Sequence, residues 1–418
     1  DSGNAEINLT GATINTGTGT FTATISAGAD KTNSGTADIT LNTVTAGALV
    51  MTNSGTTSGS DILDSGVLTV SGTSSFTTAA SDGVITLDSA NALTGVVTLN
   101  TNSSGSSANA TLDNGTTALD IAASTIGGTL TLTSGHASGI TDSGTVTVGG
   151  NFTATTDANS GVINLDSMAV DGTFTLSPHS TGAVTVVNDA GLDLAASTMG
   201  GTFSGTATTG DISDAGALAI TGAATFITGA TGSNIILDVA SNAFSSSVEM
   251  RADDGSEAFG NITFVDSAAV DFDSSASANG DLFINASTDG AVGGNLIVTA
   301  TTGNITQNTA LTVTGTTTLI TSANDATITL NNTSNAFTGA MTITTNDASG
   351  TDADVTIDGG TTALVIAAST VDGDLALRTG NASGITDTGT VTVGGNFTGT
   401  TDANSGVINM GSMAVDGT

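Results

Sequence analysis

The fold is decided by residues 115–173, which read GTTALDIAASTIGGTLTLTSGHASGITDSGTVTVGGNFTATTDANSGVINLDSMAVDGT. Residues 360–418 repeat this stretch with 47 of 59 positions identical. Self-similarity at long range is typical of solenoids and other repeat arrays. Because the second copy ends partway through a module, we expect the chain to be a window onto a longer array.

Apolar and polar residues alternate within the repeat. Residues 130–132 read LTL, residues 146–148 read VTV and residues 163–165 read INL, and Gly, Asn, Asp or Ser clusters separate such runs. Alternation with a period of two and with threonine outward predicts half-buried strands. We expect the inward side chains to form the core: Leu119, Ile121, Leu130, Leu132, Val146, Val148, Phe152, Leu165 and Phe174.

Corresponding strands recur at short, regular intervals, as Leu130, Phe152 and Phe174 show. The interval is about 21–22 residues, which suits a coil of three strands that pairs with the coils above and below it. The sequence therefore predicts an all-β fold, a parallel β-helix or β-solenoid. The run GNLIVTATTGNITQNT at residues 294–309 is expected to be an extra coil.

A coarser module also recurs, with starts near residues 37, 118, 191, 269 and 363. It divides one continuous solenoid into modules 37–117, 118–190, 191–268 and 269–362, with partial modules 1–36 and 363–418. The longest and shortest spacings between these starts differ by the length of one predicted coil. Tandem immunoglobulin-like sandwiches are the alternative, but a sandwich cannot lengthen by that much without a large insertion. The chain also lacks the Trp and Tyr that are usual in sandwich cores.

Composition limits the possible partners. The formal charge is −35 with only three Lys and Arg residues, which excludes nucleic acid and anionic membrane as electrostatic partners and favours cations. Disorder is the alternative for an acidic chain rich in small residues, but 38% of the residues are apolar and alternate regularly. No apolar run approaches the length of a membrane span.

Catalytic chemistry has few residues to draw on. The chain has no Cys and two His, and His136 is replaced by Asn381 in the second copy. We therefore interpret His136 and His179 as surface turn residues and expect no enzymatic activity. Enzymes that degrade pectin also use parallel β-helices, and the nearest local match to their sites is Arg251 with the acidic residues that follow it. The absence of Trp and Tyr removes the usual stacking platforms for sugars.

Calcium is the cofactor that the acidic composition could support, because Asp and Asn supply hard oxygen ligands. The best single candidate for a metal site is the group Asp253, Asp254 and Glu257, in a loop that follows Arg251. Other aspartates kept in both copies, such as Asp142 with Asp387, are interpreted as local turn formers.

Residues 294–308, 310–319, 328–332 and 335–339 carry a resemblance to a known family. They read GNLIVTATTGNITQN, ALTVTGTTTL, ITLNN and NAFTG, and look like the repeats of filamentous-haemagglutinin-type bacterial surface proteins. The resemblance implies a right-handed parallel β-helix, export to the bacterial cell surface, and a role in adhesion or matrix building.

These observations together predict a structural repeat shaft of an extracellular bacterial fibre or adhesin, without catalysis. We expect self-association end to end or laterally, and a host or neighbouring cell surface as a possible partner. A calcium-associated protein of a surface layer or matrix is the alternative. A β-helical lyase or hydrolase acting on polysaccharide is a further alternative that the composition disfavours.

Overall fold

The computed structural model describes residues 6–25, 37–56, 58–252, 260–273, 281–284, 291–346, 348, 352–402 and 405–418. All secondary structure in these residues is β-strand, joined by turns and short loops. The chain divides into two compact units, Asp1–Ser204 and Gly205–Thr418. The boundary between them falls within strand β25 (Phe203–Ala207).

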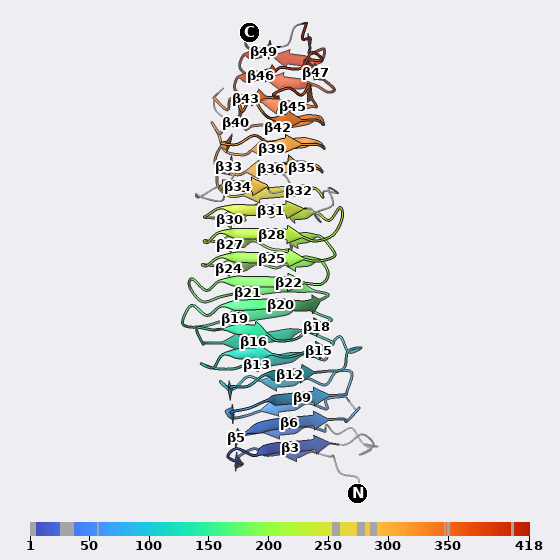
Figure 1. Cartoon of the computed structure of the whole chain (residues 1–418), viewed down its shortest axis with the longest axis vertical. Helices are drawn as coiled ribbons and strands as arrows, with labels where there is room; N and C mark the ends of the chain where they lie inside the picture. The colour runs from blue at the N-terminus through green and yellow to red at the C-terminus, as the bar shows by residue number, and fades with distance from the viewer. Residues whose placement is uncertain are drawn as a thin grey trace. The chain divides into compact units, whose positions relative to one another are not determined.

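In the first unit, strands stack in parallel ladders, which run from blue to green in Figure 1. One ladder is formed by β4 (Ile39–Leu41), β7 (Ile62–Asp64), β10 (Ile85–Leu87), β13 (Ala110–Asp113), β16 (Leu130–Ser134), β19 (Phe152–Thr156) and β21 (Thr173–Ser177). A second contains β6 (Ala48–Asn53), β9 (Ser74–Thr78), β12 (Val97–Asn100), β14 (Leu119–Ile121), β15 (Ser124–Ile126), β17 (Ile140–Asp142), β18 (Val146–Val148), β20 (Ile163–Val170) and β22 (Val184–Asn188). A third contains β2 (Thr13–Asn15), β5 (Thr43–Ala46), β8 (Leu68–Val70) and β11 (Ala92–Leu93).

The second unit repeats this organisation. One ladder contains β26 (Ile212–Asp214), β29 (Ile235–Leu237), β32 (Ile262–Asp266), β36 (Leu296–Ala300), β39 (Thr317–Thr321) and β42 (Met341–Thr344). Another contains β33 (Val270–Phe272), β37 (Ile305–Gln307), β40 (Ile328–Leu330), β43 (Val355–Asp358), β46 (Leu375–Thr379) and β49 (Phe397–Thr401). A further pair is β28 (Ala224–Thr228) with β31 (Val248–Ala252). These strands pair in parallel in both units, which confirms the predicted β-solenoid.

The core lies on the inward side of these strands, as the alternation predicts. All nine side chains expected in the core are at most 1% exposed. Phe152 pairs with Phe174 in the next coil, and their rings meet edge to face with centroids 5.6 Å apart. Like residues therefore stack on one another from coil to coil and fill the interior.

The spacing between paired strands is less regular than predicted. Leu130 pairs with Phe152, and this separation in the sequence is within the expected interval. Ile7 with Ile39, and Ile262 with Leu296, are pairs whose partners lie much farther apart in the sequence. The paired strands keep their register in both places although more residues lie between them. Within the expected extra coil, β36 and β37 are both strands of the ladders.

Candidate functional site

The residues expected to bind metal, Asp253, Asp254 and Glu257, lie outside the described residues. Arg251, on β31, forms an ion pair with Glu249 on the same strand, with 3.0 Å between Nη2 and Oε1. Within the part of the chain that the structure describes, no three His, Cys, Asp or Glu side chains gather into a group that could hold a metal ion.

Both histidines lie in turns. His136 is half-buried, and its Nδ1 accepts a hydrogen bond from the Ser138 N–H at 3.0 Å. His179 is exposed, and its Nδ1 accepts a hydrogen bond from the Ser160 N–H at 3.2 Å, in the preceding coil. Each imidazole thus caps a backbone N–H in a turn, which agrees with the interpretation as turn residues.

Several aspartate side chains join one coil to the next through hydrogen bonds. Asp142, the last residue of β17, accepts hydrogen bonds from the N–H groups of Asp166 (2.9 Å) and Ser167 (2.8 Å), both of which lie in the following coil. Asp387 does the same in the second copy with Gly411 and Ser412. Both carboxylates therefore cap the following coil, a contact that the interpretation as turn formers did not include.

The same position in other coils adds a buried amide. Asp64 binds the side chain of Asn91 at 2.8 Å, and Asp214 binds that of Asn242 at 2.6 Å. Both asparagines are at most 1% exposed. We call Asp64, Asp142, Asp214 and Asp387 the coil caps. A carboxylate at this place satisfies N–H groups of the next turn that have no partner in a strand ladder.

Burial raises the pKa of Asp64, Asp142 and Asp214 above the usual value for aspartate, because desolvation outweighs the hydrogen bonds that favour the charged form. Burial likewise raises the pKa of Asp61 and Asp266. A negative charge on these aspartates therefore carries a cost in desolvation free energy.

An asparagine ladder ties successive coils together in the second unit. The Oδ1 atom of Asn234 accepts a hydrogen bond from the Asn261 N–H at 2.9 Å, and Asn261 accepts one from the Asn295 N–H at 2.8 Å. Asn295 in turn accepts one from the Thr316 N–H at 2.8 Å. Each of these asparagines stands one residue before a strand and holds the start of the next strand in register.

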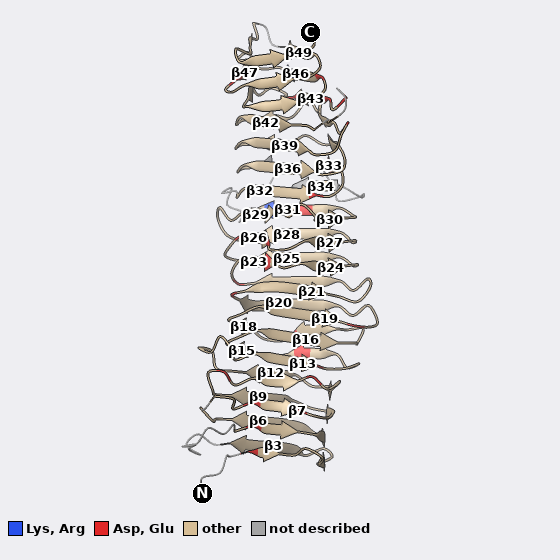
Figure 2. Cartoon of the chain, turned by 180° about the vertical axis from the view of Figure 1, so that it is seen from behind, with Lys and Arg blue, Asp and Glu red and all other residues tan. Residues whose placement is uncertain are grey.

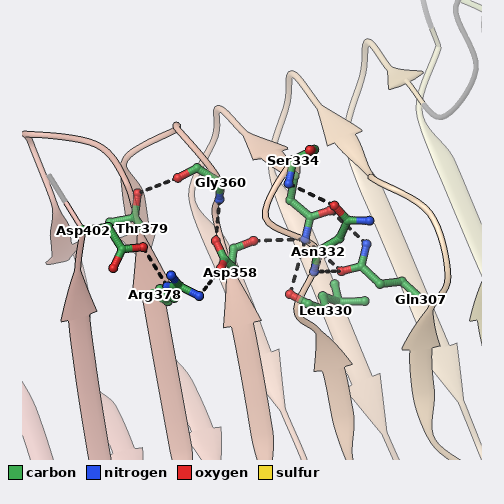
Figure 3. Close-up of polar contacts among 10 residues, drawn as sticks. Gln307, Leu330, Asn332, Ser334, Asp358, Gly360, Arg378, Thr379 and Asp402 are labelled. Carbon is green, nitrogen blue, oxygen red and sulfur yellow. Dashed lines mark hydrogen bonds and ion pairs between the residues drawn. The ribbon is translucent and has the colours of Figure 1, made fainter.

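A cation joins three successive strands near the end of the second unit, as Figure 3 shows. Arg378 on β46 donates from Nε to Asp402 at 2.7 Å and lies 3.7 Å from Asp358 of β43 through Nη1. The Asp358 side chain is 8% exposed, and its Oδ1 accepts a hydrogen bond from the Gly360 N–H at 2.8 Å. The two carboxylates raise the pKa of Arg378, with Asp402 contributing most.

A groove of about 310 Å³ runs beside this cluster. Its outward lining is Asn331, Thr356, Asp358, Ala376, Arg378, Thr398 and Thr400. In the first copy the equivalent of Arg378 is Thr133, and those of its two carboxylates are Asp113 and Asp157. The cation is therefore present in the second copy and not in the first. Comparison of the two copies could have revealed it, whereas no local motif would have.

Acidic residues are spread along each unit, as the short red segments in Figure 2 show. No helix within the described ranges is long and apolar enough to cross a membrane. The polar side chains described above link successive coils. The positive charge of Arg378 is balanced by the carboxylates of Asp358 and Asp402.

Comparisons with known proteins agree with a repeat architecture. Five segments match a family model described as repeats of unknown function (DUF5649): residues 36–100, 107–177, 181–251, 259–344 and 352–415. No curated protein and no solved structure matches the chain.

Proposed function

The chain belongs to the DUF5649 repeats, and from this premise we propose that it is a structural repeat segment of an extracellular bacterial fibre or adhesin. Its role would be to assemble at the cell surface and to mediate adhesion there, without catalysis. The resemblance of its repeats to filamentous-haemagglutinin-type proteins supports the bacterial and extracellular parts of this proposal.

One observation carries the structural role. Several described polar side chains join coils: the coil caps bind N–H groups of the next coil, and Arg378 contacts carboxylates on both sides of its own strand. The coil caps are held by hydrogen bonds to the next coil, which suits a ladder that must hold together. Parallel ladders also resist separation of coils, because each strand within them holds two neighbours.

Cell-surface location is the part that can be tested most directly. Antibodies raised against residues 1–418 would be applied to intact and to permeabilised cells of the source bacterium, with immunogold detection. We expect equal labelling in both samples, and loss of the label after brief protease treatment of intact cells. Labelling that requires permeabilisation would overturn the extracellular role.

Absence of catalysis needs a separate test. The chain would be incubated with uronic-acid and neutral polysaccharides, and new reducing ends and unsaturated products would be measured. We expect none above the buffer control. Turnover that disappears in Arg378→Thr or Arg251→Ala, but persists in Thr131→Ala, would instead assign an enzymatic site.

A further inference from the structure

One sheet surface of the second unit carries aliphatic side chains that face outward. The strands β29, β32, β36 and β39 are successive members of one ladder. Figure 1 shows β32, β36 and β39 stacked next to one another. We call its outward residues the isoleucine face: Ile236, Thr263, Val265, Ile297, Thr299, Thr318 and Ile320.

The strand registers place these residues in two rows. The first row runs Ile236, Thr263, Ile297 and Thr318, so that isoleucine and threonine alternate from strand to strand. The second row runs Val265, Thr299 and Ile320. Aliphatic residues of the two rows are therefore staggered across the face.

The side chains of the isoleucine face differ in their exposure to solvent. Ile297 is 37% exposed and is one of the few large apolar side chains exposed in the described residues, whereas outward Val265 is 8% exposed. A groove of about 220 Å³ lies beside Ile297, lined by Ile236, Thr263 and the asparagine ladder. A projecting isoleucine next to a hollow of similar chemistry is a self-complementary surface, because a second copy turned by a two-fold rotation presents the same pair.

The solenoid itself does not require aliphatic residues on such a surface. In the first unit the outward row of one ladder runs Thr40, Leu63, Thr86, Thr111, Thr131, Thr153 and Thr175, so threonine fills every position but one. The neighbouring outward row contains Thr133, Thr155 and Ser177. Hydroxyl side chains predominate at these positions, so the ladder itself does not call for isoleucine on its outward side.

The distribution of charge on the chain indicates what binds the isoleucine face. The chain carries a formal charge of −35, so two copies repel each other over most of their surfaces. The residues of the isoleucine face are uncharged, and the rim of asparagine amides beside them is neutral. Asp211, which accepts a hydrogen bond from the Asn234 N–H, and Asp238, which directly follows β29, place negative charge at the β29 edge of the face. We propose that this face binds the same face of a second copy of the chain, side by side.

The available area sets the strength of the contact. Four strands spaced by about 4.8 Å, with about 17 Å of strand each, give roughly 300 Å² per partner, against roughly 800 Å² in a standard stable interface. One contact is therefore weak. The inference rests on the proposed structural role, because copies held side by side on a cell surface are at a high local concentration, at which a weak contact is enough for lateral assembly.

The test is sedimentation velocity of the 418-residue chain over a concentration series at low and at high salt. We expect reversible self-association that strengthens with salt, because screening removes the repulsion and leaves the apolar contact. Ile297→Thr should weaken association at least about threefold and Ile297→Asp at least about tenfold. Thr153→Asp, on the threonine surface of the first unit, should leave it unchanged after any effect of charge is removed by salt. Circular dichroism would establish that each variant is folded.

Cross-linking locates the contact independently. The chain has no cysteine, so Thr299→Cys and Thr155→Cys each introduce one thiol, on the isoleucine face and on the control surface. We expect faster disulfide dimer formation for Thr299→Cys. Monomer at every concentration and salt, association indifferent to Ile297→Asp, or equal cross-linking at both positions would overturn the proposal. These outcomes are independent of cell-surface labelling, so the two proposals can fail separately.

Discussion

Asp120 shows that a repeat position can be suboptimal in one copy. It lies on the outward side of β14, and its Oδ1 atom is buried without a hydrogen-bond partner in the described structure. The equivalent residue in the second copy is Val365, on β44 (Leu364–Ile366). A buried acceptor without a partner costs stability, and a β-branched apolar residue fits the same strand position.

We therefore predict that Asp120→Val stabilises the chain by about 0.5–1 kcal/mol. The reverse change, Val365→Asp, should destabilise it. Urea unfolding of both variants beside the unaltered chain measures the effect. A loss of stability in Asp120→Val would show that the carboxylate has a favourable role in this coil.

Arg378 illustrates the opposite case, in which the second copy has gained an interaction. We predict that Arg378→Thr lowers the midpoint of thermal unfolding at low salt and that added salt abolishes the difference, because the guanidinium is exposed and its ion pairs are screened. The matched gain is Thr133→Arg, which places a cation between Asp113 and Asp157. A rise in the midpoint for Thr133→Arg at low salt would confirm the linkage, and an effect independent of salt would contradict it.

At the residue level, the sequence predicts which way a side chain points but not which residues it contacts. The alternation in LTL and VTV determines which side chains point inward, because the side-chain period of a strand is two. It carries no information on what an outward carboxylate meets in the next coil. For that reason the burial of Leu130 and Val148 could be predicted, whereas the contacts of Asp142 and Arg378 could not.

At the scale of the element, the contribution of a coil cap depends on what it buries. Asp214 holds two backbone N–H groups and the buried Asn242, whereas Asp142 holds two N–H groups that are nearer to solvent. We predict that Asp214→Ala costs about 1–3 kcal/mol and that Asp142→Ala costs less, because water can replace part of its contacts. The exposed Asp171→Ala is the control and should change stability by less than about 0.5 kcal/mol. Equal effects at all three positions, measured by urea unfolding, would contradict the capping role.

Coil length is the element-level property that the sequence predicts poorly. Between Phe152 and Phe174 the chain keeps the expected interval, since only a short turn separates consecutive strands. Ile262 and Leu296 lie farther apart in the sequence, and the ladder continues in register nevertheless. Extra residues in a connection cost little closure entropy, so selection on the ladder does not fix their number. The recurrence of strands in the sequence does not by itself distinguish a longer connection from an additional coil.

At the scale of the whole molecule, fold class was predictable and the site was not. Repetition, alternation and the near absence of long straight-chain residues point to a β-solenoid whatever the details of each coil. The predicted metal group at Asp253, Asp254 and Glu257 falls outside the described residues, and the clusters that do form depend on stacking between distant stretches. The fold of a repeat protein follows from local sequence patterns. Its clusters of side chains depend instead on how strands from different coils are paired.

The last prediction concerns acidity and the chain as a whole. Burial raises the pKa of Asp61, Asp64, Asp142, Asp214 and Asp266, so the native state binds protons more tightly there than the unfolded chain does. Where the unfolded state binds fewer protons, stability falls as pH rises. The stabilising contribution of protonation is complete below about pH 4, the ordinary range for aspartate, and is lost as pH rises through the raised values.

We therefore expect the midpoint of thermal unfolding to increase as pH is lowered from about 7 towards about 4.5, and the general repulsion of a chain with charge −35 acts in the same direction. Salt at neutral pH should reproduce the part that comes from repulsion and leave the part that comes from burial, because buried groups are screened less. Asp214→Asn removes one buried titrating group and should flatten the remaining pH dependence. Calorimetry across this pH range, at low and high salt, separates the two contributions. A midpoint that falls steadily on acidification would show that the hydrogen bonds to these carboxylates outweigh their desolvation.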